Sequence, residues 1–360
     1  MKNAVYEYIE PTDKEKEAIW KDSVFVFDTN VLLNLYRFSK NTRDALINSM
    51  KKKKKRIWIP YHVAYEFMEN RCSVIFESGE RYEKLREQAN DFIGCCVQQL
   101  RRKDTDAEVK QLKKQIETWL TSEQDKDLLI ANPLNDAILD QLLLLFEGKV
   151  GRRYSSEELK EIKDEGKTRY EKKIPPGYKD SKKQNSAEDD NNMYGDLIIW
   201  KQVMEYAKKE KCNITLVVND TKEDWWSKPK GKTIGPRAEL RKEFHERTSK
   251  QFLLYTMERF LQLCNEEDGQ RVEDSVLEEV ISVDKEQKRK DEKQQKDEVD
   301  LSKQITELER RIENKKTMIE ILEKEAEDEE YSDFLQPKIS QLYSGIETLR
   351  QRMKMLDNIL

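Results

Sequence analysis

The chain has 360 residues, of which 39% are charged and 36% hydrophobic, and its formal net charge is −5 at pH 7. This balance fits a modest core with long solvated helices better than one uniform globule. The small net charge gives no global argument for nucleic-acid binding, and the five cysteines and two histidines show no zinc-ligand spacing. No apolar run approaches the roughly 20 residues of a membrane helix, and the first residues lack a secretory pattern, so we expect a cytoplasmic protein with free thiols.

The first strong pattern is a junction between a strand and a helix. After a short helix expected over 11–21, an apolar strand over 25–27 ends in Asp28-Thr29-Asn30, and a dense apolar helical stretch follows at once. Asp28 therefore stands at the carboxyl end of a buried strand, where open α/β sheets place their ligands. Thr29 or Asn30 can cap the following helix. A strand-to-helix turn with a capping aspartate explains this stretch equally well.

A second junction of the same kind follows. A helix is expected over 41–50, a basic run occupies 51–55, and a short strand over 56–60 leads into a helix over 61–72. Glu66 lies in the first turns of that helix, in a place that matches the first aspartate. Taken alone, Glu66 is explained as an exposed helix residue. The basic run is interpreted as a solvated loop. The alternative is that its lysines form the rim of a binding site and attract the phosphates of a nucleic acid.

The next part of the chain, about 73–190, is strongly charged and shows no sheet-forming pattern. Helices are expected over 122–129, 134–146 and 155–170, and a loop from 174 onward. We interpret this region as a large helical insertion in an α/β domain.

A third junction carries two further aspartates. Asp196 lies in the first turn of a helix that opens at 195, where capping explains a carboxylate fully. A strand over 213–219 then ends at Asp220, and Asp224 follows four residues later. Three more elements complete the domain: a helix over 237–246, a strand over 252–255 and a helix over 257–264.

The composition changes after the domain 1–265. Residues 266–300 read as a charged helical connector, and 301–360 carries two apolar sets at helical spacing, separated by an acidic stretch. Two arms of similar length predict an antiparallel coiled-coil hairpin, with Pro337 at the start of the second arm. One hairpin has too little core to stand alone, so its apolar seam is expected to continue onto another chain or onto the main domain.

The acidic positions are expected to converge. If the strands are parallel, their carboxyl ends meet at one edge of the sheet and gather four carboxylates, Asp28, Glu66, Asp196 and Asp220. These would repel each other unless a divalent cation neutralised them, and Mg²⁺ or Mn²⁺ suits a site built only of oxygens. Such ions can activate water against a phosphodiester. No serine–histidine or cysteine–histidine pair offers a rival mechanism.

The motifs around these carboxylates resemble those of the PIN-domain nucleases. The core motifs are Val26-Phe27-Asp28-Thr29-Asn30-Val31-Leu32, Tyr65-Glu66-Phe67, Gly195-Asp196-Leu197-Ile198 and Val217-Val218-Asn219-Asp220. Details that match the larger PIN-like subgroup are Leu35-Tyr36-Arg37, Ile59-Pro60-Tyr61, Asp224-Trp225-Trp226 and Ile234-Gly235-Pro236-Arg237-Ala238-Glu239-Leu240. The resemblance covers about 23–263 without the insertion, excludes the hairpin, and implies an α/β PIN-like domain with a central parallel sheet flanked by helices.

The resemblance also implies residue roles. Metal binding and catalysis fall to Asp28, Glu66, Asp196 and Asp220. Asp224 would be an additional ligand or would orient one, and Thr29 and Asn30 would orient Asp28 by hydrogen bonds. Arg237 and Lys222 are candidates for contact with a substrate phosphate, and for Arg237 a structural ion pair remains an equal alternative.

The expected function is a Mg²⁺- or Mn²⁺-dependent endonuclease, with RNA, single-stranded or structured, favoured over DNA by analogy alone. The alternatives are a DNA nuclease of the same fold and a non-catalytic PIN-like scaffold that acts through its hairpin. The complete acidic set favours the enzyme. A homodimer or a partner protein is expected at the hairpin, and a role as a toxin or in phage defence is implied by the family without a residue that marks it.

Overall fold

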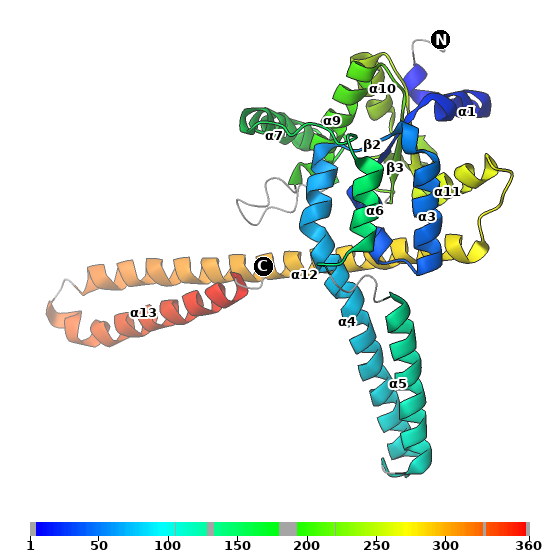
Figure 1. The fold of residues 1–360 in the computed structure, drawn as a ribbon. Helices are drawn as coiled ribbons and strands as arrows, with labels where there is room; N and C mark the ends of the chain where they lie inside the picture. The colour runs from blue at the N-terminus through cyan, green and yellow to red at the C-terminus, as the bar shows by residue number, and fades with distance from the viewer. Residues whose placement is uncertain are drawn as a thin grey trace. The chain divides into compact units, whose positions relative to one another are not determined.

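The computed structural model describes residues 5–104, 106–127, 133–179, 193–219, 221–326 and 329–357. The chain packs as two units, Met1–Asp284 and Lys285–Leu360, which are called here the N-terminal and C-terminal units. Within the N-terminal unit a sheet lies among helices (Figure 1). Among the described residues, no helix is both long and apolar enough to span a bilayer.

The centre of the N-terminal unit is a sheet of four parallel strands. Its order is β2-β1-β3-β6, and its strands are β1 (Val24–Phe27), β2 (Ile57–Trp58), β3 (Ile214–Val218) and β6 (Phe252–Thr256). Phe27 of β1 pairs with Val217 of β3, so the carboxyl ends of the two central strands lie side by side. The predicted parallel sheet is confirmed. A separate antiparallel pair consists of β4 (Trp226–Ser227) and β5 (Gly235–Pro236).

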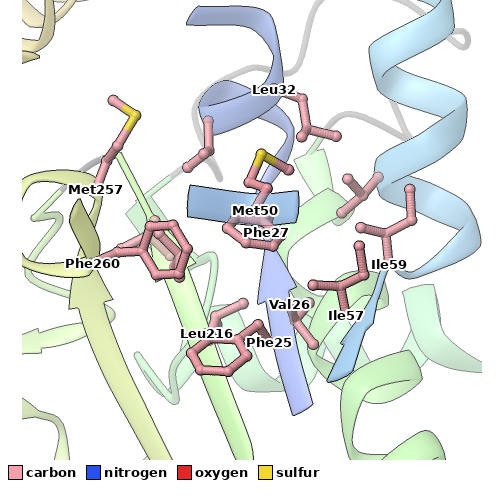
Figure 2. Close-up of a cluster of buried hydrophobic side chains, with 14 of the residues drawn as sticks. Phe25, Val26, Phe27, Leu32, Met50, Ile57, Ile59, Leu216, Met257 and Phe260 are labelled. Carbon is pink, nitrogen blue, oxygen red and sulfur yellow. The ribbon is translucent and has the colours of Figure 1, made fainter. Parts of the chain in front are cut away.

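Both faces of the sheet are covered, as all-parallel sheets require. Three helices pack on one face: α1 (Asp13–Asp22), α3 (Lys40–Lys52) and α11 (Met257–Glu266). Phe260 of α11 packs edge-on against Phe25 and Phe27 of β1, and Figure 2 shows Met50 of α3 in the same cluster. The opposite face carries α9 (Gly195–Glu210) and α10 (Ala238–Thr248), from which Trp200 and Phe244 contact Phe252 of β6.

Short elements complete the unit. The α2 helix (Thr29–Leu33) follows β1 directly. Short 3-10 helices include η2 (Tyr6–Tyr8), η3 (Asn34–Tyr36), η4 (Lys54–Arg56) and η6 (Pro229–Gly231).

The insertion is helical, as predicted, and begins within one long helix. The helix expected over 61–72 extends much further, as α4 (Tyr61–Gln99), and α5 (Ala107–Asp127) lies alongside its second half (Figure 1). Arg86 of α4 donates to Glu117 and Gln124 of α5, so the two helices are held together by side-chain contacts. The other insertion helices are α6 (Ala137–Phe146) and α7 (Ser156–Glu171).

The C-terminal unit contains the predicted hairpin. It consists of the second part of α12 (Asp274–Glu325) and of α13 (Glu329–Asp357). Their apolar seam consists of Ile312, Ile319, Leu335, Ile339 and Ile346. One expectation was wrong: α13 begins at Glu329, and Pro337 lies inside the helix instead of at its start.

Candidate active site

Asp28 lies at the edge of the sheet where the strands end. Its backbone N–H donates to Val217 O at 3.0 Å, so β3 holds the residue in line with β1. Asp28 also occupies the N-cap position of α2, and its side chain makes no capping hydrogen bond. The expectation that Thr29 or Asn30 caps this helix was wrong, because the helix begins at Thr29. The cap position thus places the carboxylate of Asp28 beside the first backbone N–H groups of α2.

The electrostatics of Asp28 are unfavourable in the metal-free protein. Burial and the nearby negative charge of Glu66 raise the pKa of Asp28 from 3.8 to about 6. The positive charge of Lys222 and the backbone amides of Thr29 and Asn30 act in the opposite direction and do not cancel the increase. A carboxyl group with a raised pKa next to another carboxylate is the arrangement that a bound cation relieves.

Glu66 is brought to Asp28 by a contact between two elements. Its Oε2 accepts a hydrogen bond of 2.6 Å from Thr29 Oγ1, so the hydroxyl predicted to orient Asp28 holds Glu66 instead. Its Oε1 lies 3.2 Å from His62 Nε2, one helical turn earlier on α4. The side chain of Glu66 is 19% exposed, which excludes the interpretation as an ordinary solvated helix residue.

Asp196 enters the site because α9 begins against Glu66. A Cβ atom at Gly195 would lie 2.8 Å from Glu66 Oε1, so only glycine allows this approach with Glu66 in its present position. Trp225 Nε1 donates to Asp196 Oδ2 at 3.2 Å. The structure therefore places Glu66 between Asp28, which follows β1, and the start of α9, where Asp196 lies; that these three carboxylates share one metal site stays a prediction.

Asp224 has different surroundings. Its side chain is fully buried, and its Oδ2 accepts hydrogen bonds from the backbone N–H groups of Gly177 at 3.0 Å and Lys179 at 3.3 Å. Gly177 has a φ of +89°, and a Cβ atom there would lie 3.2 Å from the Asp196 Cβ. Of the two roles that the sequence left open, this geometry favours positioning: Asp224 fixes the loop that packs behind Asp196.

Asp220, the fourth predicted carboxylate, lies outside the described residues. Its neighbour Asn219 is 8% exposed and donates from Nδ2 to Asp284 Oδ1 at 3.1 Å. Asp284 thus adds an acidic side chain at the end of β3, and sequence reasoning missed it. No sequence signal distinguished it from the other acidic residues of the predicted connector.

The two candidates for contact with a substrate phosphate, Arg237 and Lys222, have different surroundings. Arg237 donates to both carboxylate oxygens of Glu239, at 2.6 and 3.2 Å, and to Tyr178 Oη at 3.0 Å. The structural ion pair left open by the sequence is therefore present. Lys222 lies near enough to Asp28 to lower its pKa, which keeps a positive charge beside the carboxylates.

The basic run over 51–55 is more structured than expected. Lys53 is buried, forms an ion pair with Glu267 and lies over the rings of Trp20 and Phe25. Its side chain is thus part of the packing under the sheet and is not available to a phosphate.

The chemical type of the candidate metal ligands suits a hard divalent cation. Asp28, Glu66 and Asp196 offer only carboxylate oxygens, which Mg²⁺ and Mn²⁺ prefer. Within the part of the chain that the structure describes, no three acidic, histidine or cysteine side chains stand close enough together to hold an ion as they are. The acidic residue at the end of β3, Asp220, lies outside that part.

The arrangement of carboxylates at the ends of β1 and β3 was compared with known families. A family model described as a PIN-like domain matches residues 24–240. The chain belongs to the PIN-like domain family. The match contains the site residues from Asp28 to Asp224, the fold it implies is of the nuclease type, and Asp284 and the hairpin lie beyond it. Comparison with curated proteins and with solved structures found no match.

Proposed function

We propose that this PIN-like protein is a Mg²⁺- or Mn²⁺-dependent endonuclease that hydrolyses phosphodiester bonds, of RNA in preference to DNA. The proposed ligands are Asp28, Glu66, Asp196 and Asp220. The observation that carries the proposal is the pair formed by Asp28 and Glu66, which the Thr29 bridge holds together at the carboxyl edge of the sheet. A protein gains nothing in stability from such a pair, so its occurrence is better explained by a cation that binds there.

The chemistry of the site follows from its residues. A divalent cation bound there would neutralise the carboxylates, lower the pKa of an attacking water and stabilise the leaving oxygen of a phosphodiester. Thr29 holds Glu66 in position, and Trp225 holds Asp196. Asp224 secures the loop at Gly177, which packs behind Asp196. Lys222 supplies a positive charge near Asp28 that favours an incoming phosphate.

The proposal is tested with purified full-length protein and 5′-labelled single-stranded RNA and DNA of the same sequence, in Mg²⁺, Mn²⁺ or EDTA. We expect internal cleavage of RNA with either ion, slower or no cleavage of DNA, and no cleavage in EDTA. Cleavage of DNA alone would contradict RNA as the substrate and would still support metal-dependent hydrolysis. Metal binding without cleavage of either strand would contradict the enzyme and favour the scaffold.

We also propose that the hairpin mediates association, with a second copy as the simplest partner. Beyond its internal seam the hairpin exposes large apolar side chains: Met318, Ile321, Phe334, Tyr343 and Met355. Exposed apolar side chains on an otherwise charged helical pair are typical of a surface that another helix covers. Symmetric dimers are the commonest assembly of a single chain.

A further inference from the structure

A pocket with aromatic walls lies beside the candidate active site in the N-terminal unit. Its volume is about 100 Å³, which is below the ~300–1,000 Å³ of pockets for drug-sized ligands and suits a single small ring system. Its lining includes Tyr61, His62, Tyr65, Arg153, Tyr154 and Ile198. None of these residues has a role in the nuclease chemistry proposed above.

The pocket shares two helices with the carboxylates. His62 lies one turn before Glu66 on α4, and its Nε2 is 3.2 Å from Glu66 Oε1. Ile198 follows Asp196 by two residues on α9. One helical turn is ~5 Å, a distance that a single nucleotide spans, so a base in the pocket and a phosphate at the carboxylates can belong to one strand.

Aromatic rings on α4 line the pocket. Tyr61 and Tyr65 are nearly parallel, with ring centroids 6.4 Å apart and planes at 16°. His62 and Tyr65 are 6.2 Å apart with planes at 25°, and Tyr65 is 37% exposed. Parallel, accessible aromatic faces are the surfaces on which proteins stack unpaired bases.

Arg153 adds a positive charge that no described residue neutralises. Its guanidinium lies 5.9 Å from the centre of the Tyr61 ring, and it forms no ion pair within the described ranges. Its neighbour Arg152 is by contrast bound to Glu158 and Glu205. An exposed arginine over an aromatic ring can contact a phosphate or stack on a base.

The polar groups of the pocket wall are mostly engaged. Gln202 accepts from the backbone N–H of His62 and donates to Arg152 O, and Tyr154 Oη donates to Glu205 Oε2 at 3.0 Å. The pocket therefore offers ring faces and one cation, with few free groups for reading the edge of a base. Recognition by stacking is tolerant of base identity.

We propose that this pocket binds one unpaired nucleobase of the substrate strand next to the phosphodiester at the carboxylates. The base stacks on the rings of Tyr61 and Tyr65, and Arg153 contacts the strand beside it. This subsite rests on the proposed nuclease function and deepens it, because a base can enter the pocket only where the strand is single-stranded. It predicts a preference for unpaired strands with weak base selectivity.

The test measures binding separately from cleavage. The full-length Asp28→Asn protein is titrated, in Ca²⁺, into a fluorescein-labelled single-stranded 12-nucleotide RNA of mixed sequence, and anisotropy gives Kd. In this background Tyr65→Ala and Arg153→Ala are each expected to raise Kd about 10-fold, the order of one lost stacking contact. The matched controls are Trp119→Ala, an exposed aromatic residue of α5, and Arg102→Ala, an exposed arginine in the connection between α4 and α5, each expected to change Kd less than twofold.

A second RNA series replaces one base at a time by an abasic nucleotide. One position is expected to weaken binding to the parent protein about 10-fold and to have little effect on binding to Tyr65→Ala. Equal Kd values for the pocket variants and the controls, or an abasic scan without a sensitive position, would overturn the subsite. RNA binding that depends on the pocket, together with a wild-type protein that cleaves nothing, would count against the nuclease and leave the base-binding pocket standing.

Discussion

At the scale of single residues, Asp28 connects stability to function. Its pKa of about 6 lies above the ordinary value of 3.8, so between pH 4 and pH 6 the folded chain binds more protons than the unfolded chain. The free energy of unfolding of the metal-free protein must then fall as pH rises through this window. The loss is complete above about pH 6 and amounts to at most about 3 kcal/mol for a shift of this size.

The first prediction concerns the Asp28→Asn variant, which cannot ionise. In EDTA at pH 7.5 it should be more stable than the wild type by about 1–3 kcal/mol, and near pH 4 the difference should disappear. Urea unfolding at the two pH values measures this. A variant that is less stable than the wild type at pH 7.5 would show that the carboxylate is stabilised by partners and is not strained by Glu66.

The second prediction concerns Gly195, where α9 meets Glu66. In Gly195→Ala the new Cβ would lie 2.8 Å from Glu66 Oε1, so the carboxylate of Glu66 has to shift from its present position. We expect nuclease activity to fall at least 10-fold. The matched control is Gly79→Ala, a helical glycine of α4 with open space around it, which should gain about 0.5–1 kcal/mol in stability and keep full activity. Equal activity in both variants would show that the position of Glu66 is not critical.

Sequence reasoning could propose Asp28 and Asp196 as site residues because one follows a recognisable strand and the other opens a helix. Asp28 ends an apolar strand, and Gly195 and Asp196 open a helix, so the pattern places them in space without knowledge of long-range contacts. The partner of the Thr29 hydroxyl could not be predicted this way, because the choice between Asp28 and Glu66 depends on a rotamer set by α4. Asp284 could not be found either, since its contact with Asn219 spans 65 residues.

At the scale of elements, the start of α12 helps to hold α3. Ser39 occupies the N-cap position of α3, and its own side chain makes no capping hydrogen bond. Glu279 of α12 holds this end of α3 by other contacts: its carboxylate accepts from the Ser39 N–H at 2.6 Å, from Ser39 Oγ at 2.7 Å and from Thr42 Oγ1 at 2.5 Å. A carboxylate at a helix N-terminus also interacts favourably with the helix dipole.

The third prediction is that Glu279→Ala lowers the free energy of unfolding by about 1–3 kcal/mol. The neighbouring Glu278 is exposed, so Glu278→Ala should change stability by less than about 0.5 kcal/mol. Thermal unfolding of the two variants beside the wild type gives the comparison. A difference between them of less than 0.5 kcal/mol, an estimate taken from typical surface substitutions, would mean that α3 does not depend on this cap.

The lengths of elements were predicted less well than their existence. The long α4 extends 27 residues beyond the predicted end at 72, because its charged second half is stabilised by α5 and not by a strong local pattern. Pro337 was assigned to a helix start, yet α13 begins at Glu329 and contains it. Packing against α12 through Leu335 and Ile339 can outweigh the backbone hydrogen bond that proline removes.

At the scale of the whole molecule, the two packed units contain different kinds of proposed functional residues. The N-terminal unit ends at Asp284 and contains every proposed ligand, while the C-terminal unit contributes a seam of apolar residues and an exposed apolar surface. We therefore expect the chemistry to belong to the first unit and association to the second.

The fourth prediction is that the full chain is a dimer and that a chain ending at Asp284 is a monomer with retained cleavage. Light scattering at several concentrations measures the mass. The full-length double variant Met318→Asp and Ile321→Asp, which changes two exposed apolar positions, should also be a monomer. Dimers in all three proteins would place the interface on the N-terminal unit, and a monomeric full chain would contradict self-association.

The fifth and most direct test of the account is the binding of Mn²⁺ to the full-length protein by isothermal titration calorimetry. We expect the wild type to bind Mn²⁺, with release of protons near pH 6 because Asp28 is then partly protonated. Asp28→Asn should bind at least 10-fold more weakly, whereas Asp164→Asn, which changes an exposed aspartate of α7, should bind as the wild type does. Equal affinities in all three proteins would contradict the claim that Asp28 and its neighbouring carboxylates form a metal site.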